Sequence, residues 1–425
     1  MTDIRAGSTY RAVLATPGAL RFCVAGAVGR MPMAMFSLGS LLLVAALTGR
    51  YGLAGLVSAA GSVTYAVCGP QFARLADRYG QRRVLRPMAV VFTITTAGFV
   101  TCAELRAPAW AVLATGALAG AAMPSLGSMV RARWSALLGS GPALNTAYAL
   151  ESVVDELVFV VGPAVVTLLA TEVQPAAGVV TAAAACALGT LALAGQVSTE
   201  PAAHPVPAAR PGARRAGRLP SPGLVTLVPT VVFLGAMFAT IDLSTVAFAQ
   251  QHGHKPLAGL ILGTYALGSA VGGIWYGSRP WRAPLERRFA VTLGLTVTGV
   301  ATFWVMPGLA ALAAVIFVAG LTISPTLIAA FSLVERQARP GRRTEGMAWV
   351  SSAASVGIAA GSAFAGQVVD AGGARWGYGL AAGWGGLALA CCLAGLPRLR
   401  VPAAPEDSEI LGVSDAIKTE PAADG

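Results

Sequence analysis

The chain has 425 residues, of which 55% are hydrophobic and only 12% are charged, and its mean hydropathy is +0.68. Soluble domains carry about 25% charged residues, so this composition excludes an ordinary soluble protein. A net charge of +11 can indicate a nucleic-acid partner, but here the basic residues are dispersed through short segments rather than gathered in one arm. The composition therefore predicts a polytopic membrane protein that binds no nucleic acid.

The first long apolar run, Phe22–Leu47, is too long for the apolar core of a cleaved signal peptide. Eleven further runs have about the 20-residue length that crosses the hydrocarbon of a bilayer. Together they predict twelve membrane-spanning helices: Phe22–Leu47, Leu53–Leu75, Val84–Ala103, Ala109–Leu137, Ala143–Thr171, Ala176–Val197, Leu224–Gln250, Leu257–Gly277, Phe289–Met306, Leu309–Val334, Gly346–Val369 and Trp376–Leu396.

The runs fall into two sets of six. Residues 1–20 form an N-terminal tail, 21–197 the first bundle, 198–223 a linker rich in proline and arginine, 224–397 the second bundle, and 398–425 an acidic tail predicted to be disordered. A shift of 199 residues aligns Gly162 with Gly361 and Ser152 with Ser351. We therefore expect an all-α membrane protein with two pseudo-symmetric six-helix bundles.

Basic residues are distributed unequally over the two sides of the predicted spans. One set of loops and both tails holds 25 of the 30 lysines and arginines, the opposite loops hold 4, and Arg30 lies inside the first span. The total of 25 includes Arg131 and Arg133, which are assigned to a loop on the basic side. The positive-inside rule then predicts a protein of the cell membrane with both termini in the cytoplasm.

Three acids, Glu151, Asp155 and Glu156, lie inside the fifth apolar run. On a helix Glu151 and Asp155 share a face with Gly162, whereas Glu156 is placed roughly a fifth of a turn away. A charge at bilayer depth costs roughly 2.5 to 3.5 kcal/mol, so these acids should face a partner or a water-filled cavity. Arg30, at a comparable depth in the first span, is the candidate partner.

Burial and a nearby arginine act in opposite directions on the proton affinity of a carboxyl group. One of the three acids could therefore exchange a proton near neutral pH while another stays paired. The alternative is a static buried ion pair that fixes helix packing. Asp242, a fourth acid inside the seventh run, either lines a binding cavity or makes a packing hydrogen bond.

The loop after the second span reads Ala73-Arg-Leu-Ala-Asp-Arg-Tyr-Gly-Gln-Arg-Arg83. It resembles the signature loop of the major facilitator superfamily, with the matching residues Asp77, Arg78, Gly80, Arg82 and Arg83. Two residues depart from the family pattern, Ala73 in place of glycine and Gln81 in place of arginine. The resemblance implies the two-bundle fold with neighbouring first and fifth spans. Asp77 can accept hydrogen bonds at a helix N-terminus and pair with an arginine, which would hold one half against the other in one gate state.

Gly162-Pro163 in the fifth span resembles the end of the glycine–proline motif of proton-coupled exporters, and the proline favours a helix bend. Only the Gly-Pro core of that motif matches. The fourth-span arginine of the exporter pattern is also missing between Ala109 and Ala122, so any proton would have to use Arg30 and the fifth-span acids.

These features predict a secondary active transporter that works by alternating access, with protons, a small and largely apolar molecule, and the lipid bilayer as partners. Export of a drug or secondary metabolite is favoured over uptake of a metabolite, and a non-transporting sensor or a membrane enzyme is a more distant alternative. No nucleotide-binding loop, cofactor motif or catalytic constellation occurs, and His252 and His254 lack the further ligands of a metal site. We expect a monomer, and the sequence names no substrate.

Overall fold

The computed structural model describes residues 10–203, 221–254, 257–279, 281, 283–338 and 342–400. The predicted linker and C-terminal tail fall mostly outside the described residues. Within them the chain is helical and contains no strand, and twelve helices are long and apolar enough to span a membrane. The all-α fold and all twelve predicted spans are confirmed.

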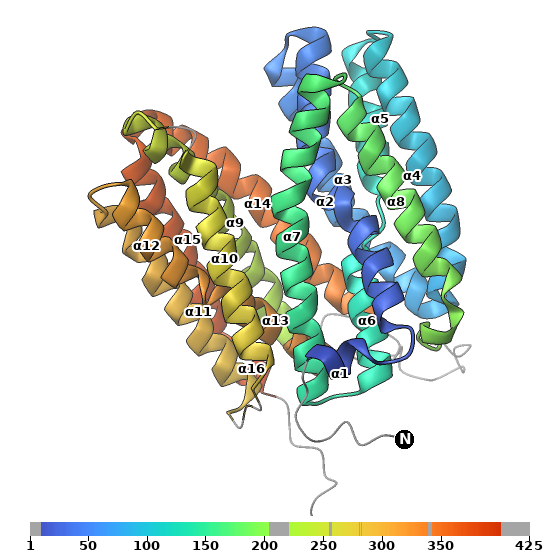
Figure 1. Cartoon of the computed structure of the whole chain (residues 1–425), viewed down its shortest axis with the longest axis vertical. Coiled ribbons are helices and arrows are strands. Elements are labelled where there is room, and N and C mark those ends of the chain that lie inside the picture. The colour runs from blue at the N-terminus through green and yellow to red at the C-terminus, as the bar shows by residue number, and fades with distance from the viewer. Residues whose placement is uncertain are drawn as a thin grey trace, which may run out of the picture.

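The first bundle contains α2 to α8, and the second contains α9 to α15 (Figure 1). The bounds of the first bundle are Ala19–Thr48 (α2), Tyr51–Tyr79 (α3), Gln81–Glu104 (α4), Ala109–Ala122 (α5), Leu126–Leu138 (α6), Pro142–Glu172 (α7) and Ala177–Gly195 (α8). Those of the second are Pro222–Gln251 (α9), Leu257–Gly277 (α10), Leu285–Ala301 (α11), Leu309–Gly320 (α12), Ile323–Gln337 (α13), Arg343–Gly372 (α14) and Ala374–Ala394 (α15). Two short helices, Tyr10–Leu14 (α1) and Leu396–Leu399 (α16), lie at the ends, and single 3₁₀ turns occupy Val197–Thr199 and Phe303–Val305.

The two bundles touch near one end and diverge toward the other (Figure 1). The contacts between them involve α3 with α14, α7 with α10 and α13, and α6 with α14. The joined end carries α1 and α16, whereas the diverging end carries the loops that follow α2, α4, α7 and α9. The structure is therefore closed on the side of the N-terminal helix and open on the opposite side.

The fourth and tenth spans are each interrupted near the middle. The fourth is divided into α5 and α6 at Met123–Ser125, where Met123 is extended because a following proline disfavours the helical conformation. The tenth is divided into α12 and α13 at two turn residues, shortly before Pro325. The interruptions occupy corresponding places in the two bundles, each close to a proline, Pro124 or Pro325.

The internal repeat is visible in the helix packing. A Cβ added at Gly162 of α7 would lie 2.8 Å from the Ala34 Cβ of α2, and one at Gly361 of α14 would lie 2.3 Å from the Ala236 carbonyl oxygen of α9. The aligned glycines thus allow the fifth and eleventh spans to approach the first and seventh spans, respectively. α7 continues as one helix through Pro163.

Arg131 and Arg133 do not lie in a loop. The assignment of both residues to a basic loop is wrong, because they belong to α6 and are 2% and 0% exposed. The apolar run extends past them to Leu138, so the fourth span carries two buried arginines beyond Ala122. The excess of basic residues on this side of the protein is otherwise unchanged.

Close packing of α2 on α8 depends on two glycines. A Cβ at Gly189 would meet the backbone of Gly29 at less than a normal contact distance, whereas a Cβ at Gly98 on α4 has nothing within 4 Å. We predict that Gly189→Leu separates the two helices and lowers stability by about 1 to 3 kcal/mol. Thermal unfolding of the purified protein in detergent measures the loss. Gly98→Leu is the matched control, and an equal loss in both variants would contradict this packing role.

Candidate functional site

Four charged side chains from three helices meet inside the first bundle. Arg30 of α2 donates to Glu151 through Nη2 at 2.5 Å and to Asp155 through Nη1 at 2.7 Å. Arg131 of α6 donates to the other Asp155 oxygen at 2.5 Å. Glu151 is fully buried, and the Asp155 side chain is 22% exposed. We call these four residues the charge cluster. Its two positive and two negative charges balance.

The sequence predicted the pairing of Arg30 with the fifth-span acids but missed Arg131. The fourth span was considered to lack an arginine, because only its first half was considered and Arg131 was assigned to a loop. The available signal was the apolar run itself, which continues to Leu137 on the far side of Arg131 and Arg133. An arginine with apolar residues on both sides within a span is a candidate partner for a buried acid.

Further donors surround Glu151. The indole nitrogen of Trp134 donates to its Oε1 at 2.9 Å, and the Cys23 thiol approaches the same oxygen at 3.4 Å. Glu151, on α7, therefore accepts bonds from two other helices of the same bundle, α2 and α6. Fully satisfied buried carboxylates of this kind hold helices in place, since every change of charge would leave a donor unpaired.

Glu156 faces the other bundle. It accepts a hydrogen bond of 2.6 Å from the Ser269 hydroxyl of α10, and Ser269 also bonds to Ser324 of α13 at 2.9 Å. From its position in the sequence we expected Glu156 about a fifth of a turn from the face of Asp155. This offset is too small, because consecutive residues of a helix are rotated by about 100°, which is more than a quarter of a turn. This rotation directs Glu156 away from the charge cluster. Glu156 forms no ion pair with any described residue.

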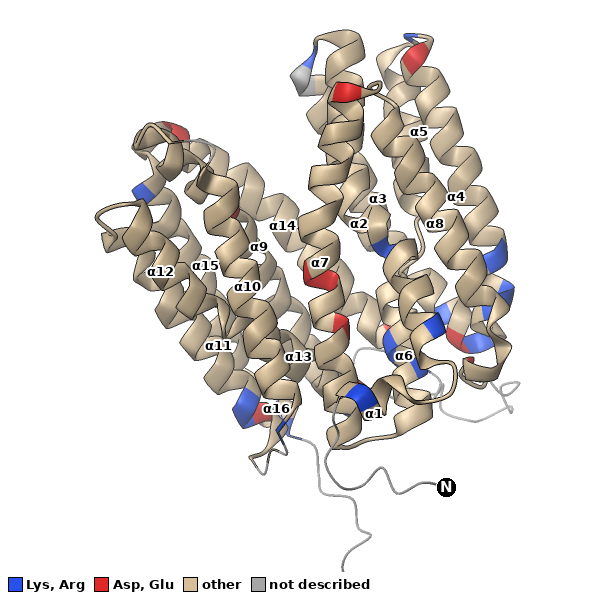
Figure 2. Ribbon diagram, in the orientation of Figure 1, with Lys and Arg blue, Asp and Glu red and all other residues tan. Residues whose placement is uncertain are grey.

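Asp242 lies midway along α9 and is exposed in the structure, although α9 packs against α10, α14 and α15. It makes no hydrogen bond or ion pair with a described residue, so the packing hydrogen bond considered from the sequence is absent in this part of the chain. Its charge interacts with that of Glu156. In Figure 2 red acidic positions are seen near the middle of α7 and also at its end away from α1.

Asp77 joins the two bundles. Its carboxylate accepts hydrogen bonds from the backbone nitrogens of Thr344 at 3.4 Å and Glu345 at 3.0 Å, in the first turn of α14. Its negative charge therefore lies at the positive end of that helix. Asp77 pairs with no arginine among the described residues. Arg78 instead lies over the ring of Tyr79, 5.0 Å from its centroid.

The rest of the signature loop shapes the turn between α3 and α4. Gly80 has φ 91°, a conformation that favours glycine. The backbone nitrogen of Arg82 donates to Glu200 at 2.8 Å, so that this acid caps α4 from beyond α8. The side chains of Arg82 and Arg83 are exposed.

Gln81 stands where the family pattern has arginine, and the structure explains the difference. Its amide oxygen accepts a bond of 2.8 Å from Nε of the fully buried Arg133, and its amide nitrogen donates to the Met129 carbonyl at 3.0 Å. Arg133 also donates to Thr199 at 2.6 Å. An arginine at position 81 would place a second cation against Arg133, whereas glutamine offers it an acceptor.

More polar contacts close the joined end. Arg343 donates to the Ser135 hydroxyl at 2.8 Å, and Ser135 donates to Glu335 at 3.1 Å. Ser332 donates to Asn145 at 3.1 Å, and the Tyr10 hydroxyl of α1 donates to the Ile274 carbonyl at 3.1 Å. Each contact joins the N-terminal part of the chain to the second bundle. Neutral and charged hydrogen bonds of this kind are individually weak, so the closed end can separate.

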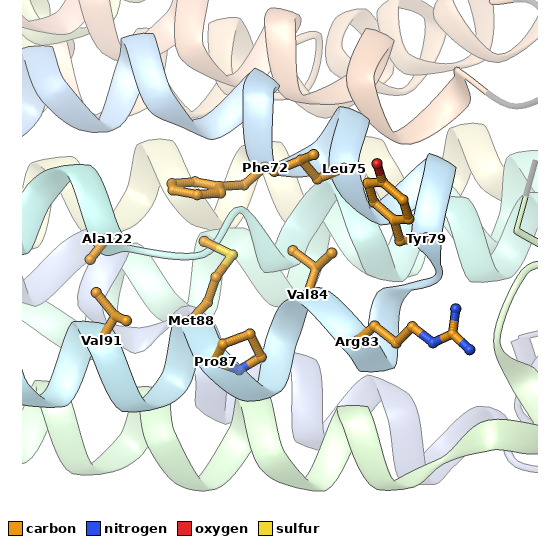
Figure 3. A pocket seen from close by; sticks show the side chains of 9 residues that line it. All are labelled: Phe72, Leu75, Tyr79, Arg83, Val84, Pro87, Met88, Val91 and Ala122. Carbon is orange, nitrogen blue, oxygen red and sulfur yellow. The ribbon is translucent and has the colours of Figure 1, made fainter. Parts of the chain in front are cut away.

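A separate crevice lies between α3 and α4 (Figure 3). Its volume is about 440 Å³, and it is lined by Phe72, Leu75, Tyr79, Arg83, Val84, Pro87, Met88, Val91 and Ala122. It contains no acid and none of the charge cluster, so it is not the site built around α7.

We predict that Glu151→Gln destabilises the first bundle, because it leaves the buried Arg30 charge short of a partner. Breaking a buried ion pair on one side costs about 3 to 5 kcal/mol. The control is Glu172→Gln at the exposed end of the same helix. Thermal unfolding in detergent should show a large shift for the first variant and none for the second. Equal stability of all three proteins would contradict the charge cluster.

Comparison with known proteins agrees with this architecture. The chain is similar to the human organic anion transporter MFSD10 (19% identity, TM-score 0.65, covering 92% of this chain and 99% of that one). It is also similar to a bacterial homologue of the iron transporter ferroportin in an outward-facing state (12%, 0.65, 90% and 98%). A third similar structure is the fucose:proton symporter FucP of E. coli (12%, 0.62, 89% and 98%).

No functionally curated protein matches the sequence. The sequence model of the Major Facilitator Superfamily, in contrast, matches residues 22–280 and 225–419. With twelve spanning helices in two bundles, the chain belongs to the major facilitator superfamily of membrane transporters.

Proposed function

We propose that the protein is a proton-coupled exporter of a small, largely apolar molecule, with Glu156 as the residue that takes up and releases the proton. The proposal rests on one observation. Of the three acids in the middle of α7, Glu151 and Asp155 are paired with arginines, whereas Glu156 bonds, among the described residues, to a serine of the other bundle.

The charge balance separates the roles of these acids. Glu151 and Asp155 belong to a neutral cluster with Arg30 and Arg131, so protonation of either acid would leave a buried positive charge unbalanced. Glu156 has no such partner, and a proton there removes an unpaired negative charge instead. Of the three acids that could exchange a proton, Glu156 is therefore the one to which we assign this role.

The position of Glu156 links its charge to the conformation. Its carboxylate accepts the Ser269 hydroxyl across the contact between α7 and α10. When Glu156 is ionised, this charge-assisted hydrogen bond holds the two helices together. Protonation weakens the bond and also removes the repulsion between Glu156 and Asp242. The proton therefore changes the relative stability of two arrangements of the bundles, which is what coupling requires.

Asp77 contributes to the gate at the joined end of the two bundles. If both termini face the cytoplasm, as the distribution of arginines predicts, the closed end is cytoplasmic and the structure is open to the outside. The bonds of Asp77 to α14 then exist only while the cytoplasmic side is closed. Export proceeds when these bonds form behind a substrate that has entered from the cytoplasm or the inner leaflet.

The direction of transport is inferred from Gly162 and Pro163, which match the core of the exporter motif. Gly162 contacts Ala34 and Met35 of α2, the helix that carries Arg30. This contact places the motif beside the helix that anchors the charge cluster. Asp242, exposed on α9, is the acid available to the substrate from the second bundle.

We predict that Glu156→Gln uncouples transport from protons. The variant should retain substrate exchange across vesicle membranes, which needs no net proton movement, and lose accumulation driven by a pH gradient. Purified protein in sealed vesicles, with a substrate found by thermal-shift screening, tests both activities. The matched control is Glu172→Gln, which removes an exposed acid from the same helix and should keep both.

Gradient-driven accumulation that persists in Glu156→Gln would refute its role as proton carrier. Accumulation with the gradient reversed in sign would identify proton-coupled uptake, and exchange without any response to pH would identify a uniporter. Glu151→Gln and Asp155→Asn serve as further comparisons, because the account assigns their effects to stability rather than to coupling.

We also predict that Asp77→Asn shortens the lifetime of the closed end. A Cβ added at Gly69 of α3 would lie 3.6 Å from the Ser352 hydroxyl of α14, so cysteines at these two positions would lie close together across the interface. In a background without the six native cysteines, Gly69→Cys with Ser352→Cys should cross-link rapidly, and Asp77→Asn should slow cross-linking several-fold. Arg78→Gln, which changes an exposed neighbour, should leave the rate unchanged. An unaltered rate with Asp77→Asn would contradict the gating role.

A further inference from the structure

Arg288, in the first turn of α11, is a buried arginine that forms no ion pair with a described residue. Its side chain belongs to a residue that is 7% exposed, and its Nε and Nη1 atoms have no hydrogen-bond acceptor. The other buried arginines of the described chain, Arg30, Arg131 and Arg133, all donate to acceptors. A buried guanidinium without an acceptor is costly, so this environment favours an anion that can accept from it.

Aromatic rings and a second donor surround the Arg288 guanidinium. Its central carbon lies 5.6 Å from the ring centroid of Tyr276 and 6.0 Å from that of Trp281. The Tyr276 hydroxyl is buried and makes no hydrogen bond of normal geometry to a described residue, although it interacts with Arg288. The Trp281 indole is fixed by a bond of 2.8 Å to the Tyr276 carbonyl. The aromatic rings thus hold the Arg288 guanidinium beside the Tyr276 hydroxyl, and two of its nitrogens still lack an acceptor among the described residues.

The positive charges near Arg288 favour an anionic ligand whose negative charge is spread over several oxygen atoms. Arg336 of α13 interacts electrostatically with Arg288, and both are positive. Glu286 is also within electrostatic range, but it forms no ion pair with Arg288 among the described residues. Arg279 lies over the Trp275 ring, 4.8 Å from its centroid.

The site lies at the boundary of the predicted bilayer. The spanning helices on either side end at Gly277 and begin at Leu285, and Trp275 is 48% exposed. Tryptophan, tyrosine and arginine collect at the level of lipid headgroups, where the phosphate groups of the membrane are found.

We infer that Arg288 and Tyr276 form a binding site for the phosphate group of an anionic membrane phospholipid. Arg288 donates to the phosphate oxygens, the Tyr276 hydroxyl provides a second donor, and Trp281 packs beside the headgroup. Arginine suits this task because its planar guanidinium bonds to two phosphate oxygens at once. The site lies outside the charge cluster and does not depend on proton coupling.

Thermal unfolding of the full-length protein in nonionic detergent tests this site. The probes are short-chain phosphatidylglycerol, short-chain phosphatidylcholine and inorganic phosphate, each titrated separately. We expect phosphatidylglycerol to stabilise the wild type far more than phosphatidylcholine does. Arg288→Gln should require about tenfold more phosphatidylglycerol for the same shift. Arg287→Gln removes the same charge from the exposed neighbouring residue and should behave like the wild type.

Tyr276→Phe provides a second test if Arg288→Gln does not fold, since it removes one hydroxyl and retains the ring. It should also weaken the response to phosphatidylglycerol. An equal, Arg288-dependent response to inorganic phosphate would support the phosphate site and identify a soluble anion as its ligand. Equal stabilisation by both lipids, or an equal loss in Arg287→Gln and Arg288→Gln, would overturn the proposal.

Discussion

The neutral cluster of Arg30, Arg131, Glu151 and Asp155 determines how the remaining charges of the protein can act. Two arginines and two acids lie in the low-dielectric interior, but none of them is a free charge there, because each is paired with an opposite charge of the first bundle. The bundle can then move as one body with its charges intact. Glu156 and Asp242, two acids in the middle of spans and outside this cluster, form no ion pair with a described residue, and Glu156 bonds to the second bundle.

This arrangement separates rigid and movable contacts along α7. On one face the helix is anchored to α2 and α6 by ion pairs and by the Trp134 indole. On the other face it meets α10 and α13 through serine hydroxyls, asparagine and backbone carbonyls. The bond from Ser269 to ionised Glu156 contributes about 1.5 to 3 kcal/mol and each bond between neutral groups about 1 kcal/mol, whereas loss of one partner of a buried ion pair costs about 3 to 5 kcal/mol. The interface between the bundles is therefore the weaker of the two and the one that can open.

Much of the fold followed from the sequence, because a span needs only length and apolar composition. The twelve helices and the two sets of six were accessible in this way, whereas the interruption of the fourth span near Pro124 was seen only in the structure. The site was harder to predict. Arg131 was missed because a charge near the end of a span looks like a loop residue in one dimension, and only the fold shows that Asp155 lies opposite. The separate directions of Asp155 and Glu156 follow from helical rotation, but the partner that each one meets depends on how two bundles pack. The lack of an ion pair between Arg288 and any described residue could not be read from the sequence, since it depends on every residue around it.

The central claim is that protonation of Glu156 shifts the balance between the two openings. It is tested most directly by pulsed electron paramagnetic resonance between spin labels at Leu105→Cys and Val305→Cys, exposed positions at the open ends of the two bundles. The account predicts that the distance distribution changes between acidic and alkaline pH, and that Glu156→Gln abolishes this change while Glu172→Gln does not. A pH-dependent change of the same size in Glu156→Gln would contradict it.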